Sequence, residues 1–263
     1  MKSIKKRILG YISAVLLTSF IHVGNSSALT LELALVVDGS GSINAAEWQT
    51  QMLGYQSVFS SGTFYDDYVA TSVYDSIVVG VYQFGTFVQE EIAWTEITNN
   101  ADATAFGNLF LGITQDAGWT NTVGGINAAM DGIMTNSFAG DNFVMDISTD
   151  GYPTVCADDI LVTSLSCDTT IARADAIAAA DAARANGITV NALGVGDYID
   201  PVFLTELVSG DPDGFYMQTA YADFGTTLEL KIGREIAGVP EPATILLLGL
   251  GLLGFAAQKR KKV

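Results

Sequence analysis

Leu31-Glu32-Leu33-Ala34-Leu35-Val36-Val37-Asp38-Gly39-Ser40-Gly41-Ser42 joins a nearly continuous apolar run to an acidic, glycine-rich turn. An apolar run of this kind is typical of a strand that is buried on both faces of a parallel sheet. Similar runs recur at 77–84, 143–148 and 188–195, and segments long enough to be helices separate them. Strands that alternate with helices predict an α/β fold with a doubly wound, mostly parallel sheet and helices on both faces.

The remaining elements follow from the same patterns. Phe87–Trp94 alternates between apolar and polar residues and is expected to pair with 77–84 as an antiparallel edge strand, and 215–218 is a further short strand. Gly187 is placed to cap a helix in the left-handed conformation. We expect helices over 45–59, 102–111, 123–134, 170–186, 201–208 and 224–236, and a plain loop over 65–68.

The turn Asp38-Gly39-Ser40-Gly41-Ser42 places one carboxylate and two hydroxyls at alternate positions. Gly39 and Gly41 are expected to allow the unusual backbone angles that point these three side chains inward. Oxygen ligands of this kind suit a hard divalent cation, and Mg²⁺ keeps several waters when protein ligands fill only part of its shell. Asp38, Ser40 and Ser42 are therefore candidate ligands.

Two later segments can complete such a shell. Gly118–Ile126 carries the triplet Thr120-Asn121-Thr122 just before a predicted helix, and Ser148–Pro153 carries Asp150-Gly151 at the end of a predicted strand. In their order and spacing, the three segments resemble the loops of the metal-ion-dependent adhesion site (MIDAS) of von Willebrand factor A (VWA) domains. The resemblance covers roughly residues 29–236.

The resemblance implies a metal site with five ligands, with four further residues supporting the metal loops. The ligands are Asp38, Ser40, Ser42, Thr120 and Asp150, and the supporting residues are Gly39, Gly41, Thr122 and Gly151. It also implies Mg²⁺ as the ion, with Ca²⁺ or Mn²⁺ as alternatives. Segments 91–97 and 210–215 bear a weaker resemblance to an uncharacterised bacterial group of VWA domains, which implies no activity.

The first 28 residues have the organisation of a secretory signal peptide. A positive region that includes Arg7 precedes the apolar stretch 8–23, and Ser26-Ser27-Ala28 offers small residues for cleavage. An uncleaved amino-terminal anchor is the alternative. We therefore divide the chain into a signal peptide (1–28), a VWA-like domain (29–237) and a carboxy-terminal segment (238–263).

The carboxy-terminal segment combines Pro240-Glu241-Pro242, an apolar run over 244–257 and a basic end. As a helix the run is short for a bilayer core of ~30 Å, and its basic end would stay cytoplasmic. The segment resembles the PEP-CTERM sorting signal of Gram-negative bacteria. That resemblance implies transient anchoring in the inner membrane, processing by an exosortase, and delivery to the cell envelope, cell surface or extracellular matrix.

Charge and composition exclude several classes of function. All 29 acidic residues follow Ala28, and between the end segments only Arg173, Arg184, Lys231 and Arg234 are basic. Such a surface repels nucleic acid and anionic lipid. The single histidine, His22, lies in the predicted signal peptide, so His-dependent nucleophilic catalysis is excluded and we predict no enzyme activity.

Cys156 and Cys167 are the two cysteines of the chain, and export to an oxidising compartment predicts a disulfide between them. Two free thiols are the alternative. The leading functional hypothesis is an exported adhesion or interaction module that binds an acidic group of a protein or polysaccharide through a divalent cation. The alternative is a structural component of an extracellular polysaccharide or biofilm matrix, in which the ion is purely structural.

Overall fold

The computed structural model describes residues 28–158, 167–210 and 212–237, which form one six-stranded sheet in the order β3-β2-β1-β4-β5-β6. The central strand β1 (Thr30–Asp38) is parallel to β2 (Ser76–Phe84) and to β4 (Asn142–Thr149). β5 (Ile188–Val195) and β6 (Tyr216–Thr219) continue the parallel sheet on one side. On the other side β3 (Val88–Ile97) is antiparallel to β2 and forms the edge, as the sequence predicts.

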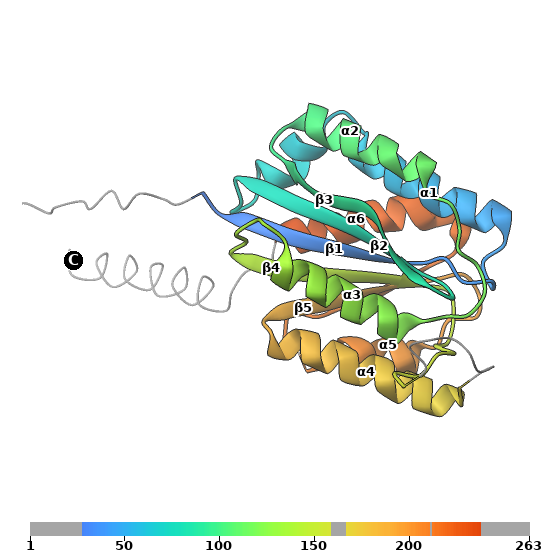
Figure 1. Cartoon of the computed structure of the whole chain (residues 1–263). Coiled ribbons are helices and arrows are strands. Elements are labelled where there is room, and N and C mark those ends of the chain that lie inside the picture. The colour runs from blue at the N-terminus through green and yellow to red at the C-terminus, as the bar shows by residue number, and fades with distance from the viewer. Residues whose placement is uncertain (1–27, 159–166, 211, 238–263) are drawn as a thin grey trace, which may run out of the picture.

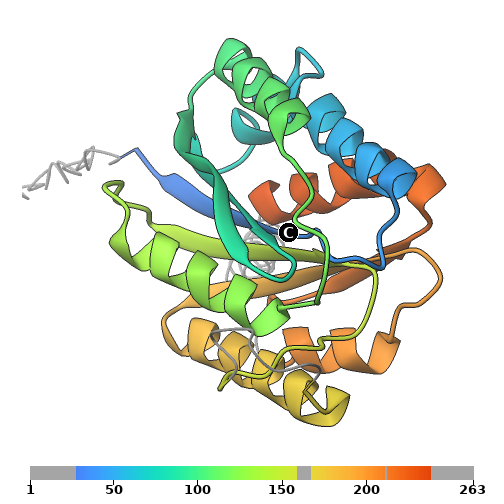
Figure 2. The ribbon, with the colours of Figure 1, turned by 45° about the vertical axis from the view of Figure 1, so that its right-hand side comes forward.

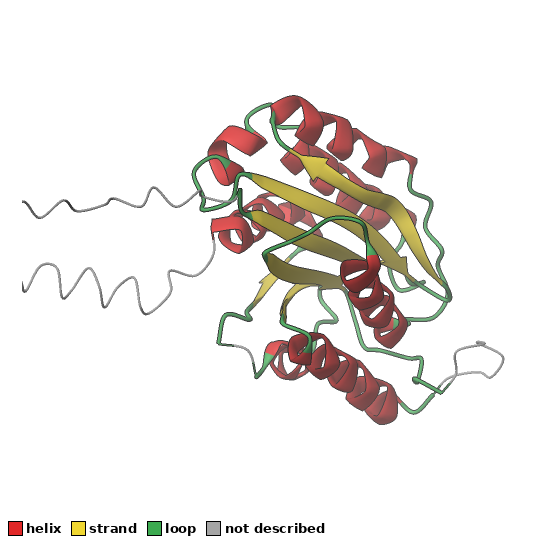
Figure 3. Ribbon diagram, turned by 60° about the vertical axis from the view of Figure 1, so that its left-hand side comes forward, coloured by secondary structure: helices red, strands yellow, loops and turns green. Residues whose placement is uncertain are grey.

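Helices cover both faces of this sheet (Figures 1 and 3). One face is covered by α1 (Ala45–Phe59), α2 (Asn100–Leu109) and α6 (Phe224–Ala237). The other is covered by α3 (Thr122–Thr135), α4 (Thr169–Ala185) and α5 (Pro201–Val208). The predicted doubly wound α/β architecture is therefore confirmed.

Strand β1 explains why the sheet needs two helical layers. Every residue from Leu31 to Asp38 is buried. Leu33 and Leu35 belong to the core under α1 and α6, whereas Ala34 and Val36 belong to the core under α3 and α4. Because successive side chains point to opposite faces, an unbroken apolar run is stable only between two covers.

Local capping sets the helix ends. Asn44 accepts hydrogen bonds from the amides of Ala46 and Glu47, and Glu47 accepts in return from the amide of Asn44, so α1 begins with a capping box. Gly187 has φ 80° after α4, as expected for its cap.

The expectation of a plain loop at 65–68 is wrong, because Tyr65–Val69 forms a π-helical turn. The side-chain oxygen of Asn100, at the start of α2, accepts hydrogen bonds from the amides of Tyr65 and Asp66. The turn is thus held by a hydrogen bond to a residue 35 positions later in the sequence, and a local sequence pattern cannot predict such a contact.

The parallel strands end at one edge of the sheet, and that edge carries Asp38 and the segment after Thr149. β1 begins and α6 ends at the opposite edge (Figure 1). No helix in the described ranges is long and apolar enough to cross a membrane. The predicted signal peptide, the apolar run 244–257 and the sorting motif at Pro240, Glu241 and Pro242 lie outside the described residues.

Candidate metal centre

The first loop of the candidate site is fixed by Asp38, which is fully buried at the end of β1. Its Oδ1 accepts a hydrogen bond of 2.8 Å from the amide of Ser40, which folds the turn back onto the carboxylate. Ser40 is also fully buried, and its Oγ lies 3.1 Å from Oγ of the exposed Ser42. The alternate spacing of the motif thus gathers all three side chains.

The third loop lies against the first. Ser42 Oγ donates a hydrogen bond of 2.7 Å to Oδ1 of Asp150, just beyond β4. Thr149 Oγ1 donates a hydrogen bond of 2.7 Å to Oδ2 of Asp38. The register that pairs Val37 with Ser148 places these strand ends side by side. Four of the five predicted ligands are therefore linked by side-chain hydrogen bonds.

The second loop joins this group through its backbone. Gly41 N donates to Gly118 O at 2.9 Å, and Ala117 N donates to Gly39 O at 2.8 Å. Figure 2 shows the segment before α3 beside the loops that follow β1 and β4. The backbone of Thr120 forms hydrogen bonds with the side chain and the amide of Thr154. In the described part of the chain, no hydrogen bond joins its hydroxyl to the other four predicted ligands.

The predicted role of the motif glycines needs correction. Neither Gly39 nor Gly41 has a positive φ; in this region the residues that do are Ala117 (60°) and Gly118 (80°). Gly39 is required for space, because a Cβ there would lie 2.1 Å from Oε1 of Gln83. A Cβ on Gly41 would lie 3.1 Å from Gly118 O, whereas Gly151 has open space around it. Close packing against the Gln83 side chain of β2 explains Gly39, and nothing in the structure explains Gly151.

The electrostatics of the site favour a cation. Burial raises the pKa of Asp38 to about 6, and the charge of Asp150 adds to the effect. Burial also raises the pKa of Asp150, with a contribution from the charge of Glu47. Among the described residues, none of the ion pairs with Lys or Arg includes Asp38 or Asp150. The two carboxylates therefore lie together without a positive side chain to offset them.

The sequence patterns missed three residues near this pair. Thr149 adjoins the predicted Asp150 and could have been found as a second hydroxyl at the strand end. Tyr221 carries a buried hydroxyl without a hydrogen-bond partner in the described structure. Burial raises the pKa of its phenol, and the charges of Asp150, Glu47 and Asp38 raise it further. No sequence signal placed Tyr221 or Glu47 at this edge of the sheet.

The residues present fit a hard divalent cation. The hydroxyls of Ser40 and Ser42 are in contact with each other and next to carboxylate oxygens, and such neutral and anionic oxygens are the ligands that Mg²⁺, Ca²⁺ and Mn²⁺ prefer. Thr122 Oγ1, at the first residue of α3, is buried without a partner. The described residues contain no cluster of three or more His, Cys, Asp or Glu side chains that could hold an ion. The candidate centre thus depends on its hydroxyls.

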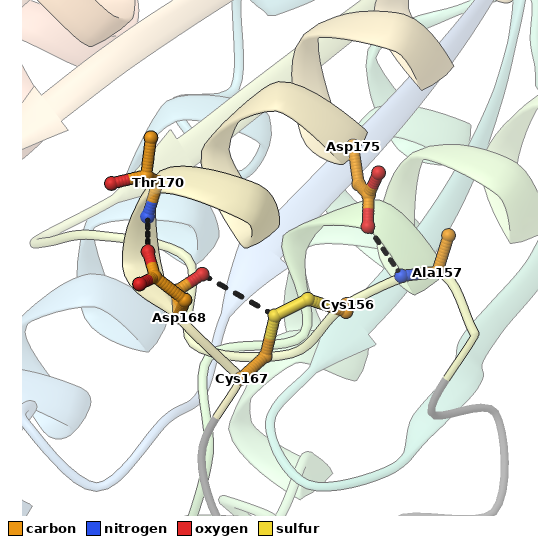
Figure 4. Close-up of a disulfide and its surroundings, with 6 residues drawn as sticks. All are labelled: Cys156, Ala157, Cys167, Asp168, Thr170 and Asp175. Atoms are coloured by element: carbon orange, nitrogen blue, oxygen red, sulfur yellow. Dashed lines mark hydrogen bonds between the residues drawn. A yellow bond between two sulfur atoms is a disulfide. The ribbon is translucent and has the colours of Figure 1, made fainter.

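A disulfide joins Cys156 to Cys167, whose Cα atoms are 5.6 Å apart (Figure 4). Both flanks are anchored to α4, since Ala157 N donates to Asp175 and the Asp168 carboxylate accepts from Thr170 N. A cavity of about 280 Å³ lies between this segment, the turn before β3 and the start of α3. Its lining includes Phe87, Asn121 and Cys156, so it adjoins the second loop of the candidate site.

The solved structures that resemble this chain include those of the following three proteins. Proximal thread matrix protein 1 from the mussel byssus aligns with a TM-score of 0.57 and 17% identity over 78% of this chain and 48% of that one. The pilus adhesin SpaC of Lactobacillus rhamnosus GG aligns with a TM-score of 0.58 and 16% identity, over 80% of this chain and 31% of SpaC. The vWF domain of the type V pili tip protein Mfa5 of Porphyromonas gingivalis aligns with a TM-score of 0.55 and 12% identity, over 80% of this chain and 97% of that domain.

The fold is therefore of the VWA type. The chain spans about half the length of the byssus protein and less of SpaC. A further structure of the byssus protein is described as having a zinc-occupied MIDAS motif. A search of curated protein sequences finds no match.

The chain belongs to the DUF1194 family, which is described as a family of proteins of unknown function. The family model matches residues 28–240. Residues 238–261 match the PEP-CTERM protein-sorting motif. That motif implies processing by an exosortase-type enzyme, and it indicates export to the surface or exterior of a Gram-negative cell.

Proposed function

We propose that this protein is an exported interaction module that binds an acidic group of a protein or polysaccharide through a divalent cation. Asp38, Ser40, Ser42 and Thr120 hold the ion together with Asp150, and Thr122 supports them. Mg²⁺ is the proposed ion, with Ca²⁺ or Mn²⁺ able to take its place. The proposal adds a metal site and a ligand class to the VWA-type fold and the sorting motif.

The observation that carries the proposal is the linkage of Asp38, Ser40, Ser42 and Asp150 at one edge of the sheet. A fully buried carboxylate with no basic partner is costly to keep ionised. A bound cation offsets that cost, because its positive charge stabilises the ionised forms of both Asp38 and Asp150. Hydroxyl ligands add no negative charge, so an ion held mainly by them keeps its affinity for a further anionic ligand.

A bound cation would supply an electrophilic position that an acidic ligand can complete by displacing water. The chain's own residues prepare that position. The hydrogen bond from Ser42 to Asp150 and the one from Thr149 to Asp38 hold both carboxylates in place. Without a cation, Asp38, Asp150 and nearby Glu47 would repel an acidic partner.

The position of the site in the fold supports an outward-facing role. α6 ends at the sheet edge opposite Asp38 (Figure 1), and the matched sorting motif follows directly after it. A protein held by that motif would therefore present the candidate site on the side away from its attachment. The similar structures belong to a pilus adhesin, a pilus tip protein and a thread matrix protein, which act in extracellular settings.

The same proposal includes the organisation of the chain and its covalent features. Residues 1–28 are a signal peptide, 29–237 the VWA-like domain and 238–263 a sorting segment, within which Pro240, Glu241 and Pro242 mark the processing site. The apolar run 244–257 anchors the protein transiently in the inner membrane. Cys156 and Cys167 form their disulfide after export. The module has no enzymatic role and no affinity for nucleic acid.

Metal titration tests the proposal. We would strip the protein with a chelator and titrate Mg²⁺, Mn²⁺ and Ca²⁺ by calorimetry, comparing wild type with Asp38→Ala and Thr120→Ala. Asp131→Ala is the matched control, because it removes an exposed acid of α3 outside the three loops. One saturable site that is lost in the first two variants and kept in the control supports the proposal. No binding by the wild type contradicts it.

A second step separates an interaction module from a matrix component with a structural ion. Binding of polygalacturonate and polyglutamate would be measured with and without the metal. We expect retention of at least one acidic polymer that requires the metal and fails in Asp38→Ala. If the metal binds but neither polymer responds to it, the ion is structural and the matrix role takes precedence.

A further inference from the structure

A second group of ionisable side chains lies in the core between β4 and α6, away from the candidate metal centre. Asp146 is in the middle of β4, and Lys231 and Glu235 are one turn apart on α6. All three side chains are completely buried. Lys231 Nζ is in direct contact with Oδ1 of Asp146 and lies 2.5 Å from Oε1 of Glu235.

This buried triad (Asp146, Lys231 and Glu235) is poorly satisfied as a set of ions. It holds one base and two acids in a site without solvent. Asp146 Oδ2 and Glu235 Oε2 have no hydrogen-bond partner among the described residues. Unpaired polar atoms and excess charge are expensive in such surroundings. An arrangement in which the triad is neutral is therefore strongly favoured.

We infer that Lys231 and Asp146 condense into an intramolecular isopeptide bond, with Glu235 as the group that transfers protons. The contact between Nζ and the carboxyl group supplies the proximity that amide formation needs. Asn191 of β5 lies close enough to Glu235 to oppose the rise in the pKa of that carboxyl, and its own Oδ1 accepts a hydrogen bond of 3.0 Å from the amide of Phe215. The Phe215 ring lies 5.5 Å from Lys231 Nζ.

The protonation of the triad suits this reaction. Burial, and after it the charge of Asp146, raise the pKa of Glu235 to about 8, so this carboxyl is neutral near pH 7. Transfer of one proton from the Lys231 ammonium to the Asp146 carboxylate in contact with it gives a neutral amine next to a carboxylic acid, and the buried surroundings favour this neutral pair. A buried, unprotonated lysine is a competent nucleophile.

The atoms balance without any further reagent. Lys231 Nζ attacks Cγ of Asp146, and the carbon–nitrogen bond forms. Glu235 donates its proton to the departing oxygen as the carbon–oxygen bond breaks, and the carboxylate so formed accepts a proton from the nitrogen. One water leaves, Glu235 returns to its protonated form, and a secondary amide remains. The product removes both charges of the ion pair and one of the two oxygens of Asp146.

Such a bond would join two segments that are 85 residues apart in sequence. α6 ends at Ala237, immediately before the residues that match the sorting motif. A pull on that segment would act along α6. A covalent link at Lys231 would pass the load to β4 in the middle of the sheet, so α6 could not slide away from it.

Proteolysis under reducing, denaturing conditions tests the inference on the full-length chain. Trypsin cleaves after Arg173 and Arg184, which lie between Asp146 and Lys231, whereas an amide at Lys231 blocks cleavage there. Wild type should yield one branched product that contains both segments, lighter by one water than the sum of its parts. Tandem mass spectrometry would place the branch at Asp146 and Lys231. Two separate fragments of full mass would overturn the inference, as would an amide between Lys231 and Asn191, which would close a loop within the fragment 185–234 and make it lighter by one ammonia.

Three variants separate the chemistry from mere folding, with circular dichroism and trypsin resistance of the native chain as folding checks. Lys231→Arg keeps the positive charge but cannot form the amide, so the branched product should vanish. Asp146→Asn should give the same branched product by losing ammonia in place of water. Glu235→Gln should slow its formation on the order of a hundredfold, the usual effect of losing a general acid–base group. A folded Glu235→Gln chain that links at the wild-type rate would overturn the role given to Glu235.

Discussion

Ser42 Oγ donates a hydrogen bond of 2.7 Å to Oδ1 of Asp150, although 108 residues separate the two in sequence. The bond joins the loop after β1 to the loop after β4. A second bond of 2.7 Å, from Thr149 to Asp38, runs in the reverse direction between the same loops. The two carboxylates of the candidate centre are therefore fixed by protein contacts alone, which lowers the entropy lost when a ligand binds.

The first prediction concerns the pH dependence of the metal-free protein. The pKa of Asp38 is raised from 3.8 to about 6 in the folded state, so between these values the folded chain binds more protons than the unfolded chain. The contribution of Asp38 to the free energy of unfolding is therefore largest below about pH 4. It falls by about 3 kcal/mol as the pH rises to about 6, and then levels off. Urea unfolding across this range measures the fall. Asp38→Asn should lack this component, and equal pH profiles for the two proteins would contradict the prediction.

The second prediction reverses the usual effect of a site mutation. Asp38→Asn removes a buried charge that no basic side chain offsets, so the metal-free variant should be more stable than metal-free wild type at pH 7. The gain should not exceed about 3 kcal/mol, the size of the pKa shift. Adding Mg²⁺ should raise the Tm of wild type and leave that of Asp38→Asn unchanged. Thermal unfolding with and without the ion gives both numbers, and an equal metal-induced rise in the two proteins would rule out Asp38 as a ligand.

The third prediction separates the two kinds of glycine in the loops. A Cβ on Gly39 would meet Gln83, whose side chain is held by hydrogen bonds with Glu91, Thr114 and Asp116 and cannot easily move. Gly39→Ala should therefore cost about 1–3 kcal/mol and weaken metal binding. Gly151→Ala is the matched control, since nothing lies within 4 Å of its added methyl, and its effect should stay within about 0.5 kcal/mol. Denaturant unfolding of both variants checks the contrast, which fails if the two cost the same.

The sequence predicted most of the fold because each element carries a local signal. The buried run Leu31–Val37 and the alanine-rich segment around α4 are examples, and α1 falls at the residues expected, 45–59. The Asp38 turn and the segment with Asp150 were expected at one sheet edge because parallel strands end together. The structure places both there, at the ends of β1 and β4.

Other features depend on contacts that no local pattern encodes. Lys231 and Glu235 have the i,i+4 spacing of an ordinary exposed pair, yet the helix turns them toward the sheet. The available signal was Asp146, an acid in the middle of the apolar run Phe143–Ile147, because a charge there requires a buried partner. The need for Gly39 was equally hidden, since Gln83 lies on the neighbouring strand β2.

The fourth prediction concerns Thr122. Its hydroxyl is buried without a hydrogen-bond partner in the described structure, so replacing it by a methyl removes no interaction of the metal-free protein. Thr122→Val should leave the stability of the metal-free form within about 0.5 kcal/mol of wild type. If the hydroxyl supports the metal shell, the same variant should bind Mg²⁺ more weakly in calorimetry. Unchanged affinity would show that Thr122 is only a packing residue of α3.

The last prediction concerns the disulfide between Cys156 and Cys167. The bond closes a loop with a sequence separation of 11, and both flanks are tied to α4 through Asp175 and Thr170. Closing a loop of this size in the unfolded chain is worth about 3 kcal/mol. The double variant Cys156→Ser/Cys167→Ser should lose about that much stability, and reduction of the wild type should cost the same. Cys156 also lines the cavity beside Asn121. Loss of the disulfide should therefore make the second loop more mobile and lower the affinity for Mg²⁺, although Asp38 keeps its position. Unfolding curves and metal titrations of oxidised and reduced protein decide the matter: if both are unchanged by reduction, the bond neither stabilises the domain nor shapes the candidate site.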